Sequence, residues 1–234
     1  MRLAFISDIH GNIHALRAVW QALQDHHIDQ IICLGDLVGY GAGPAEVIEF
    51  LETKRVKTVL GSSDARVAFD FTDRFEKREG VAETTLEWTK TVLGPEHRKF
   101  LRALPTNGRI ETPQGRLRYC HGSPHDPEAR LDLHGDEEML NAVLSELHCE
   151  ILVCGGTHIP YLRRTSRGLL VDPGSVGFSL NGEPGADIAV FDITSGGTRV
   201  SMIKVPYDYH AAAFDVMAWN LPSVIASVIR TGKP

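Results

Sequence analysis

Three short, mostly apolar runs lie in the first 60 residues, and each ends at a glycine or a carboxylate. They cover residues 3–7, 30–34 and 56–60. Their length and composition are typical of buried β-strands. Between the first two runs, apolar side chains recur at helical spacing, at Ile13, Leu16, Trp20 and Leu23. Pro44 is suited to open a second helix over 45–52. This alternation predicts a parallel sheet with right-handed crossovers.

The remainder of the sequence predicts a second set of short strands. The stretch 66–100 is polar and helical, and 109–120 indicates a hairpin around Pro113-Gln114-Gly115. Further strands are expected at 151–154, 161–164, 169–171, 188–192 and 198–204, and helices at 137–147, 209–218 and 223–230. We expect residues 1–234 to form a single domain with two sheets, a mostly parallel one from the first half and a more antiparallel one from the second half.

The bulk composition argues against some classes of function. The formal net charge of −6 disfavours a broad nucleic-acid-binding or membrane-binding surface. No apolar run approaches the length of a membrane-spanning helix, and residues 1–6 are predicted to be a strand rather than a signal peptide. The four cysteines lack CxxC spacing, and three of them lie in or beside apolar runs, where reduced buried thiols are common. We expect a cytoplasmic protein that binds neither nucleic-acid polymers nor membranes.

Side chains that bind metals follow several of the expected strands. They are Asp8, His10, Asp36, the turn 61–64, His121 and His158. Ligands bind at the carboxyl ends of strands in open α/β sheets, so these side chains should converge on one rim. Each of them alone is more simply explained as a turn, cap, core or surface residue. That explanation does not account for several such segments in one order. Mixed carboxylate and imidazole ligands suit Mn, Fe, Zn, Co or Ni.

The order of these segments resembles the calcineurin-like metallophosphoesterases. That family reads D-x-H, then G-D, then G-N-H-D/E, then a lone H, then G-H-x-H. The matching segments here are Asp8-Ile9-His10, Gly35-Asp36, Gly61-Ser62-Ser63-Asp64, His121 and Gly155-Gly156-Thr157-His158. The resemblance covers nearly the whole chain. Within the family, the sequence resembles the small prokaryotic branch, whose members are often labelled diadenosine-tetraphosphatase-like or phosphodiesterase-like.

The resemblance implies both a fold and an activity. The fold would be a four-layer α/β/β/α sandwich of two mixed sheets flanked by helices. The activity would be hydrolysis of a phosphoester or phosphoanhydride bond in a small phosphorylated substrate by a metal-activated water. A phosphatase, a phosphodiesterase and a dinucleoside polyphosphate hydrolase all fit that description.

The resemblance also implies two metal sites of unequal completeness. The first ion, manganese or another of the divalent transition metals above, would be held by Asp8, His10, Asp36 and His158. The second would share Asp36 and add His121, but its two remaining ligand positions are Ser62 and Gly156. The position of the family's leaving-group histidine is Ser63. Loss of two ligands predicts much weaker binding of the second ion.

Three accounts of the incomplete site remain open. Nearby groups could replace the missing ligands, with His125, Asp64 and Asp126 in suitable loops and Ser62 able to hold a ligand water. Alternatively, the enzyme could work with one ion. The third account is a catalytically impaired family member that binds a phosphorylated ligand or has a regulatory role.

Other candidate residues have a plainer interpretation beside the functional one. We take His121 and Asp64 as candidate catalytic residues, although bracing of the turn is the simpler role for Asp64. Asn12 and Arg66 are candidate substrate contacts, although Asn12 is most simply a helix N-cap. Arg130 and Arg163 are further candidate phosphate contacts. Six histidines are expected at the surface: His26, His27, His97, His134, His148 and His210.

Overall fold

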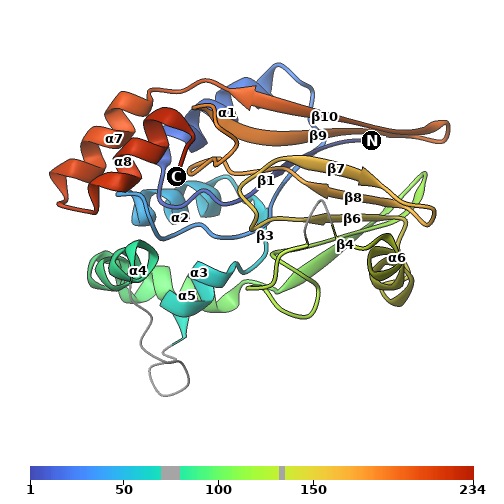
Figure 1. Cartoon of the computed structure of the whole chain (residues 1–234), viewed down its shortest axis with the longest axis horizontal. Coiled ribbons are helices and arrows are strands. Elements are labelled where there is room, and N and C mark those ends of the chain that lie inside the picture. Colours follow the sequence, from blue (N-terminus) through green and yellow to red (C-terminus); the bar gives the residue numbers. More distant parts are fainter. Residues whose placement is uncertain (70–79, 132–134) are drawn as a thin grey trace.

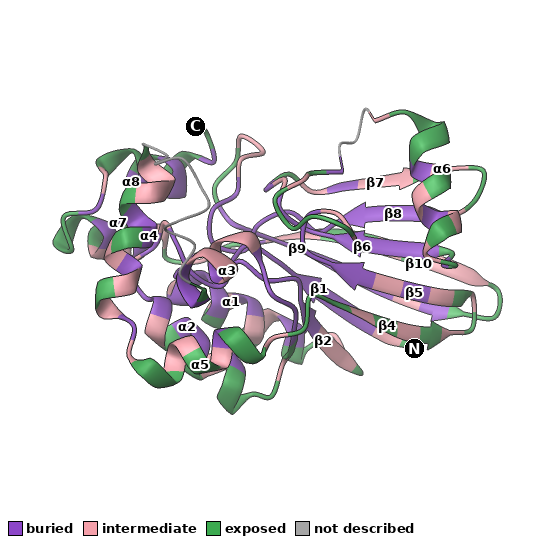
Figure 2. Ribbon diagram, turned by 90° about the horizontal axis from the view of Figure 1, so that it is seen from below, coloured by how far each residue is buried: buried purple, intermediate pink, exposed green. Residues whose placement is uncertain are grey.

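The computed structural model describes residues 1–69, 80–131 and 135–234. Two five-stranded sheets pack face to face, with helices on their outer faces (Figure 1). One buried apolar cluster fills the space between the sheets. On the outer face of each sheet, a further cluster lies between the sheet and the helices that cover it. Figure 2 shows that the inner strands of the two sheets are mostly buried, whereas the edge strands are partly exposed. The predicted four-layer α/β/β/α sandwich is therefore confirmed.

The first sheet combines strands from both ends of the chain. Its order is β10 (Gly197–Val205), β9 (Ala186–Thr194), β1 (Arg2–Ile6), β2 (Gln30–Cys33) and β3 (Lys57–Thr58). Strands β1, β2 and β3 are parallel, as predicted, whereas β9 is antiparallel to β1 and to β10. The strand expected at 56–60 is shortened to two residues, and beyond it the Leu60 N–H donates to the Pro105 carbonyl.

The second sheet is parallel at its centre and antiparallel at its edges. Its order is β4 (Asn107–Thr112), β5 (Gly115–Cys120), β6 (Ile151–Cys154), β8 (Leu169–Asp172) and β7 (Tyr161–Arg164). Strands β5, β6 and β8 run parallel to one another. The expected division into a parallel first half and a more antiparallel second half is therefore wrong. Strand β9 is buried along Ala186–Phe191. An inner position in the sheet, between β1 and β10, suits such a strand.

Eight helices are present in the described part of the chain. They are α1 (Ile13–Gln24), α2 (Pro44–Thr53), α3 (Ser62–Ala68), α4 (Val81–Val92), α5 (Pro95–Ala103), α6 (Glu137–Glu146), α7 (Tyr209–Ala218) and α8 (Ser223–Thr231). Pro44 opens α2, as predicted. The sequence predicted only a turn where α3 begins. Part of the helical stretch expected at 66–100, residues 70–79, and the expected surface residue His134 lie outside the described residues.

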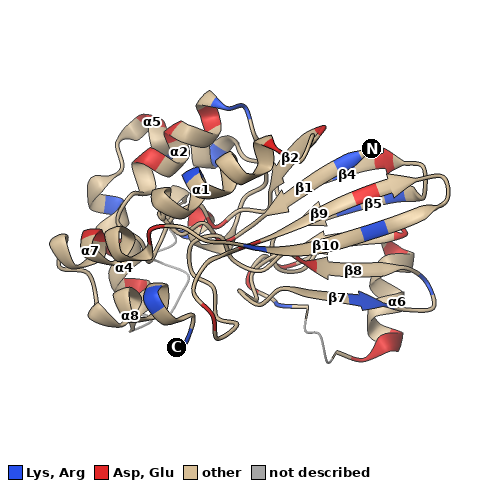
Figure 3. Ribbon diagram, turned by 90° about the horizontal axis from the view of Figure 1, so that it is seen from above, with Lys and Arg blue, Asp and Glu red and all other residues tan. Residues whose placement is uncertain are grey.

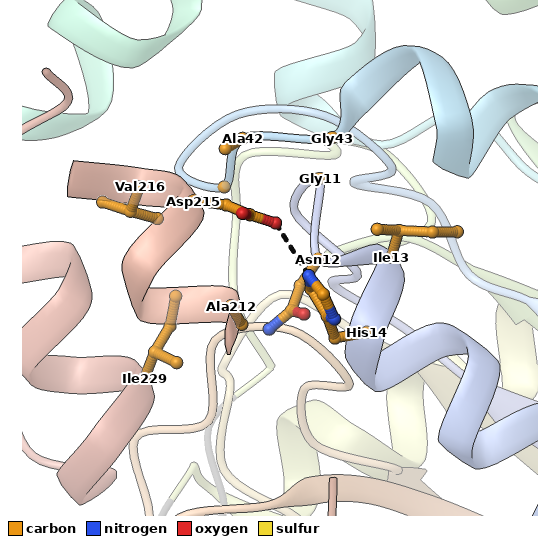
Figure 4. A pocket seen from close by; sticks show the side chains of 11 residues that line it. Gly11, Asn12, Ile13, His14, Ala42, Gly43, Ala212, Asp215, Val216 and Ile229 are labelled. Carbon is orange, nitrogen blue, oxygen red and sulfur yellow. Dashed lines mark hydrogen bonds and ion pairs between the residues drawn. The ribbon is translucent and has the colours of Figure 1, made fainter. Parts of the chain in front are cut away.

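The C-terminal helices close over the start of α1. Asn12 caps α1 and donates from Nδ2 to the Tyr207 hydroxyl at 3.1 Å. His14 Nε2 lies 2.7 Å from Asp215 Oδ2 on α7, and Figure 4 shows the two side chains pointing toward each other. Helix α7 and the segment just before it therefore contact the turn that carries the first candidate metal ligands.

The surface carries charges of both signs. Lys and Arg are interspersed with Asp and Glu along the described helices and strands (Figure 3). None of the described helices is long and apolar enough to cross a bilayer.

The packing between the sheets centres on aromatic side chains. Phe5 of β1 is fully buried and makes edge contacts with Phe191 of β9, at 5.0 Å between ring centroids, and with Tyr119 of β5, at 6.1 Å. Neighbouring residues of β1 alternate between the two faces of the sheet: Leu3 and Phe5 face the second sheet, and Ala4 and Ile6 face the helices. Phe5 therefore links both sheets.

We predict that Phe5→Ala lowers the free energy of unfolding by about 3–5 kcal/mol, because it leaves a cavity between the sheets. The matched control is Phe214→Ala on α7, where the side chain is 71% exposed, with an expected change within about 0.5 kcal/mol. Chemical denaturation measures both. Equal effects of the two substitutions would contradict the inter-sheet packing.

Candidate metal centre

The candidate ligands lie in loops that follow strands of both sheets. Asp8 and His10 follow β1 and Asp36 follows β2, whereas His121 follows β5 and His158 follows β6. All of these side chains are buried. Backbone hydrogen bonds join the first two loops, from Asp8 N–H to the Gly35 carbonyl at 3.0 Å and from His10 N–H to the Asp36 carbonyl at 2.9 Å. The predicted convergence on one rim is thus present in the geometry.

Four of these residues have a left-handed backbone conformation. The φ angles of Asp8, His10, Asp36 and His158 are 54°, 48°, 52° and 60°. Such a conformation costs a non-glycine residue on the order of 1–3 kcal/mol, and it persists where surrounding contacts impose it. The hydrogen bonds between the loops are contacts of this kind. The strain in this region is therefore concentrated on the residues that point into the site.

Backbone carbonyls orient all three histidines. Nδ1 of His10, His121 and His158 lies 2.9, 2.9 and 3.0 Å from the carbonyl oxygens of Val38, Leu34 and Phe178. A carbonyl can only accept a hydrogen bond, so each Nδ1 carries a proton. The other nitrogen, Nε2, is then the one available to a metal, as is usual for histidine ligands.

The inward-facing atoms form a compact cluster. His10 Nε2 lies 3.1 Å from His158 Nε2, and Asp8 Oδ1 lies 3.2 Å from His158 Nε2 and 3.7 Å from His10 Nε2. Asp8 Oδ1 is buried and has no hydrogen-bond partner among the described residues. Asp36 Oδ2 lies 3.8 Å from His10 Nε2 and 3.5 Å from His121 Nε2.

This cluster fits a divalent cation. Two imidazole nitrogens at 3.1 Å and the buried Asp8 Oδ1 bring three possible ligand atoms to one point, where either a proton or a metal ion would offset the repulsion between their lone pairs. Ligand atoms of Asp8, His10 and His158 all lie within 4.8 Å of one another, and so do those of Asp8, Asp36 and His121. Carboxylate and imidazole donors together suit a first-row transition metal.

The charges in the cluster are strongly coupled. Burial alone would raise the pKa of Asp36, but His121 and His10 lower that pKa to about 2. Burial likewise opposes the charged form of His121, yet Asp36 raises the pKa of that imidazole to about 10. The neighbouring histidines hold the pKa of Asp8 well below its usual range despite burial. Both carboxylates are therefore ionised at neutral pH, and an ion that binds to His121 would displace a proton from that imidazole.

Comparison with known proteins agrees with the geometry of this site. Residues 1–196 match the model of the Calcineurin-like phosphoesterase superfamily domain. The chain belongs to this family. An uncharacterized protein of Methanocaldococcus jannaschii is 29% identical over 249 residues, which cover 99% of this chain and 98% of that protein.

Solved structures agree with the family assignment. A hypothetical protein of Pyrococcus horikoshii OT3 is similar with a TM-score of 0.88 and 25% identity, over 100% of this chain and 99% of that one. A metallophosphoesterase of Sphaerobacter thermophilus is similar with a TM-score of 0.80 and 25% identity, over 99% of each chain. The predicted family is thus confirmed over the whole described fold.

In this phosphoesterase domain, both carboxylate oxygens of Asp36 accept hydrogen bonds from serines. The Ser63 N–H donates to Asp36 Oδ1 at 2.7 Å, and the Ser63 hydroxyl donates to Oδ2 at 3.0 Å. The Ser62 hydroxyl lies 3.3 Å from Oδ2. Gly156 supplies no side chain on the opposite side, where a Cβ would point toward His121 Nε2 at 3.5 Å.

The candidate replacement ligands belong to neither of the two ligand groups found among the described residues. Asp64 accepts from the backbone N–H groups of Leu37, Val38 and Gly61, at 2.8, 3.2 and 3.1 Å, so both of its oxygens are engaged. Burial, with Asp36 nearby, raises the pKa of Asp64 to about 7. Its contacts are those of a brace for the loops. His125 and Asp126 are exposed, and His125 pairs with Glu146 of α6.

Three of the four candidate substrate contacts have other partners. Asn12 accepts from the Ala15 N–H at 3.1 Å and donates to the Gly177 carbonyl at 3.0 Å, as expected of its N-cap role. Arg66 lines the pocket above the cluster, but its guanidinium pairs with Glu83 of α4. Arg163 donates to the Gly135 carbonyl. Arg130 lines the pocket.

The pocket above the cluster has a volume of about 180 Å³. Its walls include all the candidate ligands except Asp8, the two serines, and residues that the sequence did not single out: Tyr40, Ala82, Leu86, Pro127 and Glu128. Tyr40 belongs to the glycine-rich loop after Asp36, and its left-handed backbone, with φ of 53°, places it against His10. An aromatic residue in a glycine-rich loop is the sequence signal that could have indicated Tyr40 as a residue of the site.

Asp172 supports the His158 turn from below. Its Oδ2 accepts from the Thr157 hydroxyl at 2.7 Å, and its Oδ1 accepts from the Gly174 N–H at 2.8 Å. Burial raises the pKa of this carboxyl from 3.8 to about 8. The folded chain therefore holds this proton at pH values where the unfolded chain has released it.

We predict that Asp172→Asn makes stability less dependent on pH. Below about pH 4 both states are protonated and Asp172 contributes nothing. As pH rises toward 8 only the unfolded state ionises, so stability falls, with a slope of at most about 1.4 kcal/mol per pH unit for one group. Denaturation in chelator between pH 4 and 8 should show a shallower decline in Asp172→Asn. The exposed Asp25→Asn is the control, and identical declines in all three proteins would refute the prediction.

Proposed function

We propose that this chain is a divalent-metal-dependent hydrolase of phosphoester or phosphoanhydride bonds. The convergence of Asp8, His10 and His158 below the pocket, with Asp8 Oδ1 buried and unpartnered among the described residues, carries the proposal. Membership of the calcineurin-like family supports the general class of reaction.

We propose further that one ion is held strongly, by Asp8, His10, Asp36 and His158. Mn, Fe, Zn, Co or Ni bound there would supply a Lewis acid and a water of lowered pKa. Three hydrogen bonds from Ser62 and Ser63 to Asp36, together with the missing side chain at Gly156, support weak binding of a second ion. His121 then stays beside Asp36 at the pocket floor, and we propose that it contacts the phosphoryl group of the substrate.

The pocket supports a small substrate rather than a polymer. About 180 Å³ accommodates a phosphoryl group and part of its leaving group. We also propose a single domain, because the first sheet takes strands from residues 2–58 and 186–205. A cytoplasmic location is supported by four free, buried thiols, those of Cys33, Cys120, Cys149 and Cys154.

A second candidate function is phospho-ligand binding without turnover. Ser63 occupies the position where the family has a leaving-group histidine, and general acid catalysis typically contributes about 10²- to 10⁴-fold. A site that lacks this group would still bind a phosphorylated ligand. The two candidates differ in turnover and not in metal binding.

The first prediction from this proposal is a metal stoichiometry near one ion per chain. Elemental analysis after loading with Mn²⁺ and gel filtration measures it. His158→Ala should weaken Mn²⁺ binding by at least about a hundredfold, since even loss of an indirect partner commonly costs 10- to 100-fold. The control is His14→Ala, whose side chain pairs with Asp215. Two tightly held ions would contradict the one-ion scheme, and unchanged binding in His158→Ala would contradict the ligand set.

The second prediction concerns the choice of substrate. Mn²⁺ should stimulate hydrolysis of aryl phosphates, aryl phosphodiesters or dinucleoside polyphosphates much more than that of alkyl esters. Aryloxide and phosphate leaving groups need little protonation, whereas alkoxides depend on the acid that this site lacks. Initial rates across a series of leaving groups measure this preference. Tight binding of phosphate without turnover of any of these compounds would favour the second candidate function.

A further inference from the structure

Tyr40 forms one wall of the pocket and contacts the candidate metal ligands directly. Its ring meets the His10 ring edge-on, at 4.7 Å between centroids and 89° between planes. The same ring stacks on Phe178 at 4.3 Å and 11°. The Phe178 carbonyl is the group that orients His158. Tyr40 is thus packed between the parts of the site that hold two of the candidate ligands.

The backbone of Tyr40 is fixed as firmly as its ring. Its φ is 53°, and its N–H donates to the Thr85 hydroxyl of α4 at 3.1 Å. Thr85 is buried and donates in turn to the Ala82 carbonyl, and Ala82 lines the same pocket. The ring is therefore pre-positioned, so a contact from its hydroxyl to a ligand would cost little conformational entropy.

Tyr40 lines the same pocket as the candidate ligands and two arginines. His10, Asp36 and His158 lie on its walls together with Arg66 and Arg130. A phosphorylated ligand that bridges the metal ligands and the arginines would occupy this region.

The other hydroxyls in the pocket are already engaged. Those of Ser62 and Ser63 donate to Asp36, and the Arg66 guanidinium pairs with Glu83. The Tyr40 hydroxyl has no hydrogen-bond partner among the described residues. A phosphoryl group needs donors for its charged oxygens, and the hydroxyl of Tyr40, a residue that lines the pocket, is a donor of this kind.

We propose that the Tyr40 hydroxyl donates a hydrogen bond to a phosphoryl oxygen of the bound substrate. This inference rests on the proposed function, because it requires a phosphorylated ligand in the pocket. It assigns substrate binding to a residue outside the metal-binding motifs. The plainer alternative is that Tyr40 serves only as an aromatic wall, in which case its hydroxyl is dispensable.

The substitution Tyr40→Phe separates these two roles, because it keeps the ring contacts and removes the hydroxyl. Isothermal titration of the Mn²⁺-loaded full chain with inorganic phosphate measures the affinity directly and does not require turnover. We expect Tyr40→Phe to bind phosphate roughly tenfold to a hundredfold more weakly, as for loss of a hydrogen bond to a charged group. Its Mn²⁺ stoichiometry should be unchanged. Tyr209→Phe on α7 is the matched control and should bind phosphate like the parent.

The outcomes distinguish this inference from the proposed function. Unchanged phosphate affinity in Tyr40→Phe overturns the inference, and so does loss of Mn²⁺ in that variant, because Tyr40 would then act through His10. Failure of the parent chain to bind phosphate overturns it as well. If the parent binds phosphate without hydrolysing any ester and Tyr40→Phe weakens that binding, the inference stands and the hydrolase proposal fails.

Discussion

Three backbone carbonyls, those of Leu34, Val38 and Phe178, determine what the centre of this protein can do. Each accepts a hydrogen bond from Nδ1 of one histidine and leaves Nε2 of that ring facing inward. An imidazole free to rotate would present either nitrogen, and the three lone pairs would not converge. The carbonyls need rigid loops, and side chains supply that rigidity. Asp64 binds the Leu37 and Val38 N–H groups.

Ser175 has the corresponding role on the opposite side of the site. Its hydroxyl donates to the Asp8 carbonyl and accepts from the Phe178 N–H, both at 2.7 Å. It therefore couples the loop that carries Asp8 to the loop that orients His158. Because Asp8 and His10 follow a strand of the first sheet and His158 follows one of the second, the distances in the site depend on how the sheets pack. The aromatic contacts of Phe5 between the sheets thus help to set the geometry of the centre.

The sequence revealed the strands and the candidate ligands because each ligand directly follows an apolar run. That local arrangement is visible without any tertiary information. The membership of β9 and β10 in the first sheet was not visible, since pairing between residues 2–5 and 189–192 leaves no local pattern. Tyr40 was missed for a related reason. Its importance comes from contacts with His10 and Phe178, and the second of these lies 138 residues further along the chain (178 − 40).

The one-ion scheme that we propose depends on the backbone as well as on the side chains. Ser62 and Ser63 occupy Asp36 with hydrogen bonds, so the carboxylate has less capacity to bridge two cations. Gly156 has a φ of 93°, a conformation that residues with a side chain rarely adopt. A histidine introduced there would meet the cost of that conformation before it could bind a metal. Binding of a second ion through a side chain at position 156 would therefore require the turn after β6 to change shape, and that turn is held by the Gly156 N–H bond to Asp8 Oδ2 at 3.0 Å. Under the one-ion scheme, the same bond that stabilises the first site opposes the second.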